Sequence, residues 1–282
     1  MFYIIGLVIV VACVLGGYMA MGGKLGVLNQ PFEYVIILGA GIGGFVASNP
    51  LNVIKGAVRG YVAALKGPQF KKAHYIEVLS MLFDLFKLAK QKGMIALEPH
   101  VENPDTSDIL SKYPNVMKDH HLSDFIRDYL RMLTLGTDKA HEMETVLDAE
   151  IDAHHKNDHR AVGAMQTFAD ALPALGIVAA VLGVIKTMKA MDQPPEVLGG
   201  LIGAALVGTF AGVLFAYGVF GPFAAAAKNA FEADSRMYEV IKSGILAYMQ
   251  GYAPAIAIEM ARKTIDADER PSFYDLEAIL GK

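Results

Sequence analysis

The sequence is poor in charged residues and in cysteine. Of its 282 residues, 19% are charged and 54% are hydrophobic, and the mean hydropathy is +0.36. A soluble domain usually carries about 25% charged residues. Cys13 is the only cysteine, which excludes a disulfide within one chain and a cysteine-based metal site. The net charge of −4 gives no reason to expect nucleic-acid binding.

The first apolar block also lacks the basic residues that begin a secretory signal peptide. It starts at Met1 and Phe2, and a second apolar block follows almost at once. We therefore expect a retained membrane span and not a cleaved leader.

Four apolar blocks are each long enough to cross a bilayer, which takes about 20 predominantly apolar residues. The expected spans cover about residues 2–21, 34–54, 168–187 and 197–227. Asn49 and Pro50, near the end of the second block, indicate a kink or an exit from the membrane.

The chain is thereby divided into four regions. They are 1–54, with two membrane helices and a short loop; 55–165, a polar helical domain; 166–227, with two more membrane helices; and 228–282, a polar helical segment. In the polar domain, Ile76, Leu79 and Phe83 recur at helical spacing, and no strand-like alternation of any length is present. The predicted fold is all-α.

Basic residues indicate the orientation of the chain. Of 25 lysine and arginine residues, only Lys24, Lys186 and Lys189 lie near the two short loops that join the spans. Loops on the cytoplasmic side of a membrane are enriched in such residues. We therefore expect 55–165, 228–282 and both termini in the cytoplasm, and the short loops in the periplasm.

The expected spans contain no Asp, Glu, Lys, Arg or His in their cores, and Glu33 is assigned to the first short loop. Ion paths through membranes are normally marked by buried ionisable groups. If the chain conducts ions, it must borrow a carboxylate from a partner. Thr209 and Tyr217 are the notable polar side chains of the fourth span; a threonine there either lines a pore or bonds back to its own helix turn.

Small residues recur in the last two spans. The stripes are Gly200, Ala204, Gly208 and Gly212 in the fourth span, and Gly176, Ala180 and Gly183 in the third. Such stripes let helices approach closely in lipid, so packing within one chain explains them without a special function.

Two prolines frame the same pair of spans. Pro173 is expected in the first helical turn of the third span, where proline is tolerated. Pro222 lies near the end of the fourth span and would permit a kink if the helix continues past it. Either proline alone is explained by a helix boundary, but together they suggest a hinge.

Other patterns invite a ligand. His154, His155 and His159 could hold a metal, but they have the neighbours of a solvated helix face. The glycine-rich run 39–44 lies inside a span, where close packing explains it better than phosphate binding. No Ser/His/Asp or Cys/His arrangement indicates an enzyme.

Several ordered motifs resemble the MotA family of flagellar stator subunits. Residues 205–214 followed by Pro222, and residues 173–183, match the family's last two spans. Shorter matches are Gly16-Gly17-Tyr18, Gly22-Gly23, residues 39–43, Gly93-Met94, Leu97-Glu98, residues 102–104, residues 251–254, Arg262-Lys263-Thr264 and residues 269–273.

The resemblance implies an inner-membrane ring, a pentamer, around a dimer of a MotB-type subunit that supplies a transmembrane aspartate. It implies that proton flow drives motion against the rotor switch protein FliG. The coupling ion is then H⁺, and no cofactor is expected. Thr209 and Ala180 correspond to positions facing the ion path, on which we also expect Tyr217, and Pro173 and Pro222 correspond to positions of conformational coupling. Lys90 and Glu98 correspond to the rotor contact, although many relatives carry arginine at the position of Lys90.

Two other functions compete with a proton-conducting stator subunit in motility and chemotaxis. One is an energiser of envelope processes like TolQ or ExbB, whose members have three spans. The other is a membrane scaffold without ion flow.

Overall fold

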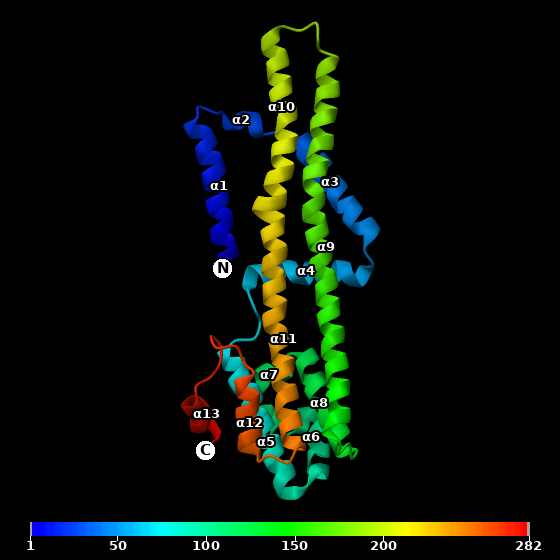
Figure 1. Ribbon diagram of the computed structural model, residues 1–282, viewed down its shortest axis with the longest axis vertical. Coiled ribbons are helices and arrows are strands. Elements are labelled where there is room, and N and C mark those ends of the chain that lie inside the picture. Colours follow the sequence, from blue (N-terminus) through cyan, green and yellow to red (C-terminus); the bar gives the residue numbers. More distant parts are fainter. Residues whose placement is uncertain (1, 281–282) are drawn as a thin grey trace. The chain divides into compact units, whose positions relative to one another are not determined.

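The computed structural model describes residues 2–280, which form helices and connecting turns without any strand in that range. Four helical stretches are long and apolar enough to cross a membrane: Phe2–Ala20, Leu25–Ser48, Ala140–Met188 and Pro195–Met249. The expectation of an all-α chain with four membrane spans is confirmed (Figure 1).

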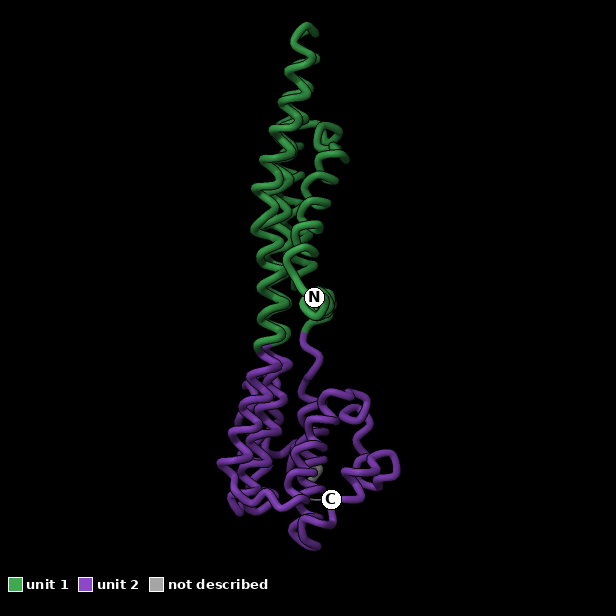
Figure 2. Tube along the Cα trace, turned by 90° about the vertical axis from the view of Figure 1, so that its right-hand side faces the viewer, with its two compact units in different colours: residues 1–67, 156–231 green, residues 68–155, 232–282 purple. Residues whose placement is uncertain are grey.

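The chain forms two compact units, which Figure 2 distinguishes by colour. Unit 1 comprises residues 1–67 and 156–231, and unit 2 comprises 68–155 and 232–282. Helices α9 (Ala140–Met188) and α11 (Gly221–Met249) contribute residues to both units. Helix α9 therefore continues through residue 165, where the sequence changes from polar to apolar. Helix α11 likewise continues through residue 227, where the sequence becomes polar again.

Unit 1 contains the apolar helices. Besides parts of α9 and α11, they are α1 (Phe2–Ala20), α2 (Leu25–Leu28), α3 (Pro31–Ser48), α4 (Leu51–Lys66), α10 (Pro195–Val213) and the π-helical segment η4 (Leu214–Phe220). None of the α1 residues is buried within the chain. Large apolar side chains also remain exposed on α3, α9 and α10, as expected for surfaces that face lipid or a neighbouring subunit.

The second span is shorter than expected, because α3 ends at Ser48 instead of continuing to about residue 54. Asn49 has extended backbone angles (φ −123°, ψ 137°), as favoured for the residue before a proline, and Pro50 is the N-cap of the next helix. The segment from Leu51 onward is therefore a separate helix, α4, which Figure 1 shows running crosswise to α9 and α11.

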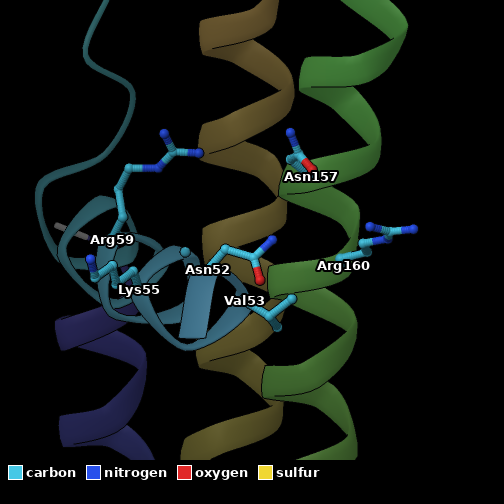
Figure 3. Close-up of a pocket in the computed structure, with 7 residues that line it drawn as sticks. Asn52, Val53, Lys55, Arg59, Asn157 and Arg160 are labelled. Atoms are coloured by element: carbon cyan, nitrogen blue, oxygen red, sulfur yellow. The ribbon is translucent and has the colours of Figure 1, made fainter. Parts of the chain in front are cut away.

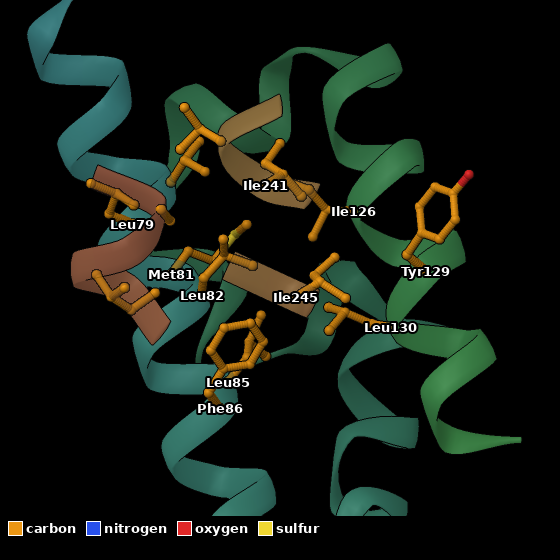
Figure 4. Close-up of a cluster of buried hydrophobic side chains, with 14 of the residues drawn as sticks. Leu79, Met81, Leu82, Leu85, Phe86, Ile126, Tyr129, Leu130, Ile241 and Ile245 are labelled. Atoms are coloured by element: carbon orange, nitrogen blue, oxygen red, sulfur yellow. The ribbon is translucent and has the colours of Figure 1, made fainter. Parts of the chain in front are cut away.

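Unit 2 is a helical domain with an apolar core. Its other elements are α5 (Lys72–Lys92), η1 (Met94–Leu97), α6 (Glu98–Glu102), η2 (Pro104–Thr106), η3 (Leu110–Lys112), α7 (Pro114–Lys118), α8 (His120–Thr134), α12 (Pro254–Lys263) and α13 (Phe273–Leu280). The core gathers buried side chains of α5, α8, α9, α11 and α12 (Figure 4). Within it, Phe86 stacks on Tyr248 with ring centroids 4.5 Å apart and nearly parallel planes.

Candidate functional site

Helices α9 and α10 approach each other along a seam of small residues. A Cβ atom added at Gly176 would lie 2.7 Å from the Gly208 carbonyl oxygen, and one at Gly212 would lie 2.6 Å from the Leu172 carbonyl oxygen. Only glycine fits at these backbone contacts. Packing within one chain therefore explains these three glycines, whereas a Cβ at Gly200 would meet nothing within 4 Å.

The same seam contains a carboxyl group that the sequence reasoning assigned to a loop. Glu33 lies in the first turn of α3, and its Oε2 atom is buried without a hydrogen-bond partner among the described residues. A Cβ at Gly208 would lie 2.7 Å from that oxygen, and a Cβ at Gly183 would lie 3.5 Å from Oε1. The two glycines thus leave a notch between α9 and α10 that the Glu33 side chain fills.

A buried carboxyl oxygen that accepts no hydrogen bond is destabilising, more so in a membrane than in water. The assignment of Glu33 to the first short loop is therefore wrong, because this residue lies in the first turn of α3, within the candidate span Leu25–Ser48. Chemically, this carboxyl can take up and release a proton, or accept a hydrogen bond from a group outside the chain.

Two residues that the family resemblance places on the ion path lie beside this notch. The Cβ position of Gly208, the residue before Thr209, is 3.1 Å from the Ala180 backbone nitrogen, so the backbones of α9 and α10 lie close together at this level. Both side chains are partly exposed. No hydrogen bond of the Thr209 hydroxyl occurs within residues 2–280, so it is available to water, an ion or another chain. In contrast, Thr187 donates to the Gly183 carbonyl oxygen at 2.9 Å.

The segment that precedes Pro222 is wound as a π-helix. The N–H of Gly221 donates to the carbonyl oxygen of Ala216, which is a bond to the fifth residue back. Because proline has no N–H, it cannot complete the regular helical ladder, and a π turn accommodates the missing bond. Tyr217 lies in this segment with 68% of its surface exposed, and the Tyr3 hydroxyl donates to the Val219 carbonyl oxygen at 3.3 Å. The residues around Pro222 thus form an irregular turn inside a long helix.

The sequence predicted Pro173 in the first turn of a helix, and this prediction is wrong. Pro173 lies well inside α9, which begins at Ala140. The polar stretch before the span is itself helical, so no helix boundary falls there. An interior proline removes one backbone hydrogen bond, which locally weakens the helix at the level where α9 meets α10.

The two candidate rotor residues lie in unit 2, at neighbouring helix ends. Lys90 is in the last turn of α5, which ends at Gly93 with a φ of 86°. Glu98 is the first residue of α6, and the intervening η1 packs back on α5. Both side chains are exposed, in agreement with a surface role.

The other patterns have structural explanations. The His154 ring stacks on Tyr238 with centroids 5.3 Å apart, and no group of three or more potential metal ligands occurs in the part of the chain that the structure describes. The buried Arg262 donates to both carboxylate oxygens of Glu259 and to the Pro271 carbonyl oxygen. Glu269 accepts from the backbone N–H of Lys72. These contacts of the motifs near the C-terminus thus stabilise a loop within unit 2.

Glu33 is the residue that sequence reasoning missed. Pro31 precedes it by two positions, and a proline followed by an acidic residue is typical of the first turn of a helix. This signal could have placed Glu33 in the second helix. Its burial against Gly183 and Gly208 could not be predicted, because no local pattern shows which helices are neighbours.

Comparisons with known proteins agree with this architecture. The family described as Motility protein A N-terminal matches residues 4–93, and the MotA/TolQ/ExbB proton channel family matches residues 117–240. Motility protein A of Escherichia coli (strain K12) is 40% identical over 98% of this chain and 94% of the relative. Chemotaxis protein LafT of Vibrio parahaemolyticus is 36% identical over 99% of this chain and 98% of the relative. The structure of C. jejuni MotAB has a TM-score of 0.78 at 19% identity, covering 96% of this chain and 98% of that chain, and so supports the fold.

Proposed function

The chain belongs to the MotA/TolQ/ExbB proton channel family as a stator subunit of the Motility protein A type, and from that premise we propose that it conducts protons together with a MotB-type partner. In this proposal the chain lies in the bacterial inner membrane with both termini in the cytoplasm. The family is one of channel and motor subunits and not of enzymes.

The observation that carries the proposal is the seam between α9 and α10. At the seam the Glu33 carboxyl packs against Gly208, the residue before Thr209, at the level of the Ala180 backbone. A single carboxyl binds a proton but does not relay it across a bilayer of about 30 Å. We propose that a second ionisable group on the proton path is a transmembrane aspartate of a MotB-type dimer. Copies of this chain would form a ring of five around that dimer.

The coupling ion in this proposal is H⁺. A hard cation such as Na⁺ needs several oxygen ligands, and the methyl group of Ala180 supplies none. Each proton that moves inward across 100 mV releases roughly 2.3 kcal/mol, which can bias a two-state element such as the segment around Pro222. Lys90 and Glu98 would then act on the rotor switch protein FliG.

Three observations favour a stator over the other candidates. The chain has four candidate spans, whereas envelope energisers like TolQ and ExbB have three. The near full-length relatives are named for motility and chemotaxis. A scaffold without ion flow would have no need to bury the Oε2 atom of Glu33 between two membrane helices.

The experiment is complementation of a deletion strain. We expect the chain to restore swimming and to co-purify with the MotB-type subunit. Swimming should stop when a protonophore is added and continue when sodium is removed. Sodium-dependent swimming would contradict the choice of ion, and normal swimming without the gene would contradict the proposed function itself.

A further inference from the structure

Helix α4 has three distinct faces. Its buried face consists of Val53, Ala57, Gly60 and Ala64. Large apolar side chains remain exposed on a second face: Leu51, Val58, Val62 and Leu65. The third face carries Lys55 and Arg59, one helical turn apart. A helix with an exposed apolar face beside a basic face is typical of the boundary between lipid and water.

The position of α4 agrees with that boundary. Only two residues separate it from the end of α3, so it follows the end of a membrane span directly. It is also held closely against α9 and α11. A Cβ at Gly56 would lie 2.9 Å from the Ala161 Cβ atom, and one at Gly60 would lie 2.9 Å from the Met165 sulfur. The helix is therefore fixed at the level where a span leaves the membrane.

A cavity of about 340 Å³ opens between α4 and α9 at this level. It is lined by Asn52, Val53, Lys55, Gly56, Arg59, Asn157 and Arg160 (Figure 3). Three of these side chains are cations and two are amides, and no acidic residue lines the cavity. The lining thus offers hydrogen-bond donors and positive charge but no carboxylate.

The charges of the lining are not all matched. Arg59 pairs with Asp158, and its guanidinium group lies 5.0 Å from the ring centroid of Phe231. Lys55 and Arg160 form no ion pair within residues 2–280. The cavity therefore keeps a net positive charge even after Asp158 is counted, and both unmatched cations are exposed.

We propose that this cavity binds the phosphate headgroup of an anionic phospholipid. The phosphate oxygens would accept hydrogen bonds from Lys55 and from Arg160, once the exposed Arg160 side chain, which points away from α4 in Figure 3, turns toward the cavity, with Asn52 and Asn157 as further donors. The acyl chains would lie along the exposed apolar face of α4. The proposal requires that α3 spans the membrane, and it does not depend on proton conduction.

The lipid is favoured over free phosphate because of the surroundings of the cavity. A soluble anion would gain nothing from Leu51, Val58 and the other exposed apolar residues of α4. A phospholipid satisfies both the cations and the apolar face. Basic pockets beside membrane helices are known to bind anionic headgroups, and each basic residue near an anionic membrane surface strengthens binding severalfold.

The test uses the full-length chain purified with its partner subunit. Native mass spectrometry would compare retention of phosphatidylglycerol with retention of phosphatidylcholine. The variant combines Lys55→Gln with Arg160→Gln. The matched control combines Lys66→Gln with Lys24→Gln, which removes two lysines outside the cavity. We expect phosphatidylglycerol to be retained roughly tenfold better by the natural chain and by the control, and this preference to be lost in the cavity variant.

A second variant guards against loss of folding. Arg160→Lys keeps the charge, so it should keep most of the preference for phosphatidylglycerol. Equal retention of the two lipids by the natural chain would overturn the proposal. So would a preference that the cavity variant retains, or one that control and variant lose equally. Inorganic phosphate alone is the last arm: if it displaced phosphatidylglycerol at millimolar concentration, the site would be a phosphate site and not a lipid site.

Discussion

The Oε2 atom of Glu33 lies 2.7 Å from the position that a Cβ atom would occupy on Gly208. The glycine therefore makes room for a carboxyl group from another helix, besides allowing α9 and α10 to approach. Gly208 therefore belongs both to the packing seam and to the surroundings of the proposed proton path. Substitutions in the seam should accordingly affect both the stability of the chain and ion flow. The two effects can be separated by altering either a glycine of the seam or Glu33.

Replacing Glu33 tests its proposed part in the path. Glu33→Gln keeps the size of the side chain but cannot release a proton, so we expect ion flow through the assembled complex to fall by about a hundredfold or more, in the range of a lost acid–base group. Glu33→Asp keeps the acid and should retain more of the flow. Both variants should still assemble with the partner, as co-purification would show. Full flow through the Glu33→Gln complex would leave this carboxyl a packing residue.

Gly176 provides a test of the seam itself. An added methyl group would meet the Gly208 carbonyl oxygen, and backbone cannot move aside as easily as a side chain. We expect Gly176→Ala to destabilise the chain by about 1–3 kcal/mol, the usual range for overpacking. Gly200→Ala is the control, because its Cβ meets nothing within 4 Å. Thermal unfolding in detergent measures both, and an equal loss in the two variants would speak against the seam.

The exposed pair Lys90 and Glu98 should act on the rotor and not on the ion path. Reversing either charge, as in Lys90→Glu or Glu98→Lys, should reduce swimming while assembly and ion flow are retained. Exposed charges steer a partner and set its register while adding little affinity. A charge reversal at the facing FliG residue should partly restore motility. The role would have to be abandoned if Lys90→Glu abolished ion flow, or if both reversals together left swimming unchanged.

The pair of Glu259 and Arg262 predicts how the stability of unit 2 depends on pH. The hydrogen bond from Arg262 lowers the pKa of Glu259 below its ordinary value of 4.5, while burial opposes this effect. A carboxyl whose pKa is lower in the folded state stabilises the protein above its ordinary pKa, and this stability is lost as the pH falls through the folded value.

We therefore expect the unfolding temperature to drop below about pH 4.5, and to drop less steeply in Glu259→Gln. At neutral pH this variant should be less stable than the natural chain, because Arg262 loses its charged partner in a buried position. The exposed Glu277→Gln is the control and should follow the natural chain. Parallel pH profiles for all three proteins would contradict the assignment.

The fold was largely predictable from the sequence, because apolar blocks long enough to span a membrane are a strong signal. Details that depend on which helices pack together were not predictable. The stripe of the third span was expected to include Ala180, but the buried residue of the seam is Ala179, with Ala180 beside it and partly exposed. The polar residues before Pro173 are also helical, so the change from polar to apolar residues did not mark the start of α9. The π turn before Pro222 depends on how the chain absorbs a missing hydrogen bond, which residue type alone does not decide.

Proton flux into vesicles tests the central claim most directly. Three preparations would be compared: the chain alone, the complex with the MotB-type subunit in an unplugged form, and the same complex with the partner's transmembrane aspartate replaced by asparagine. We predict proton uptake only in the second preparation, because Glu33 alone cannot relay a proton across the membrane. A robust leak through the chain alone, or no uptake by the unplugged complex, would contradict the account.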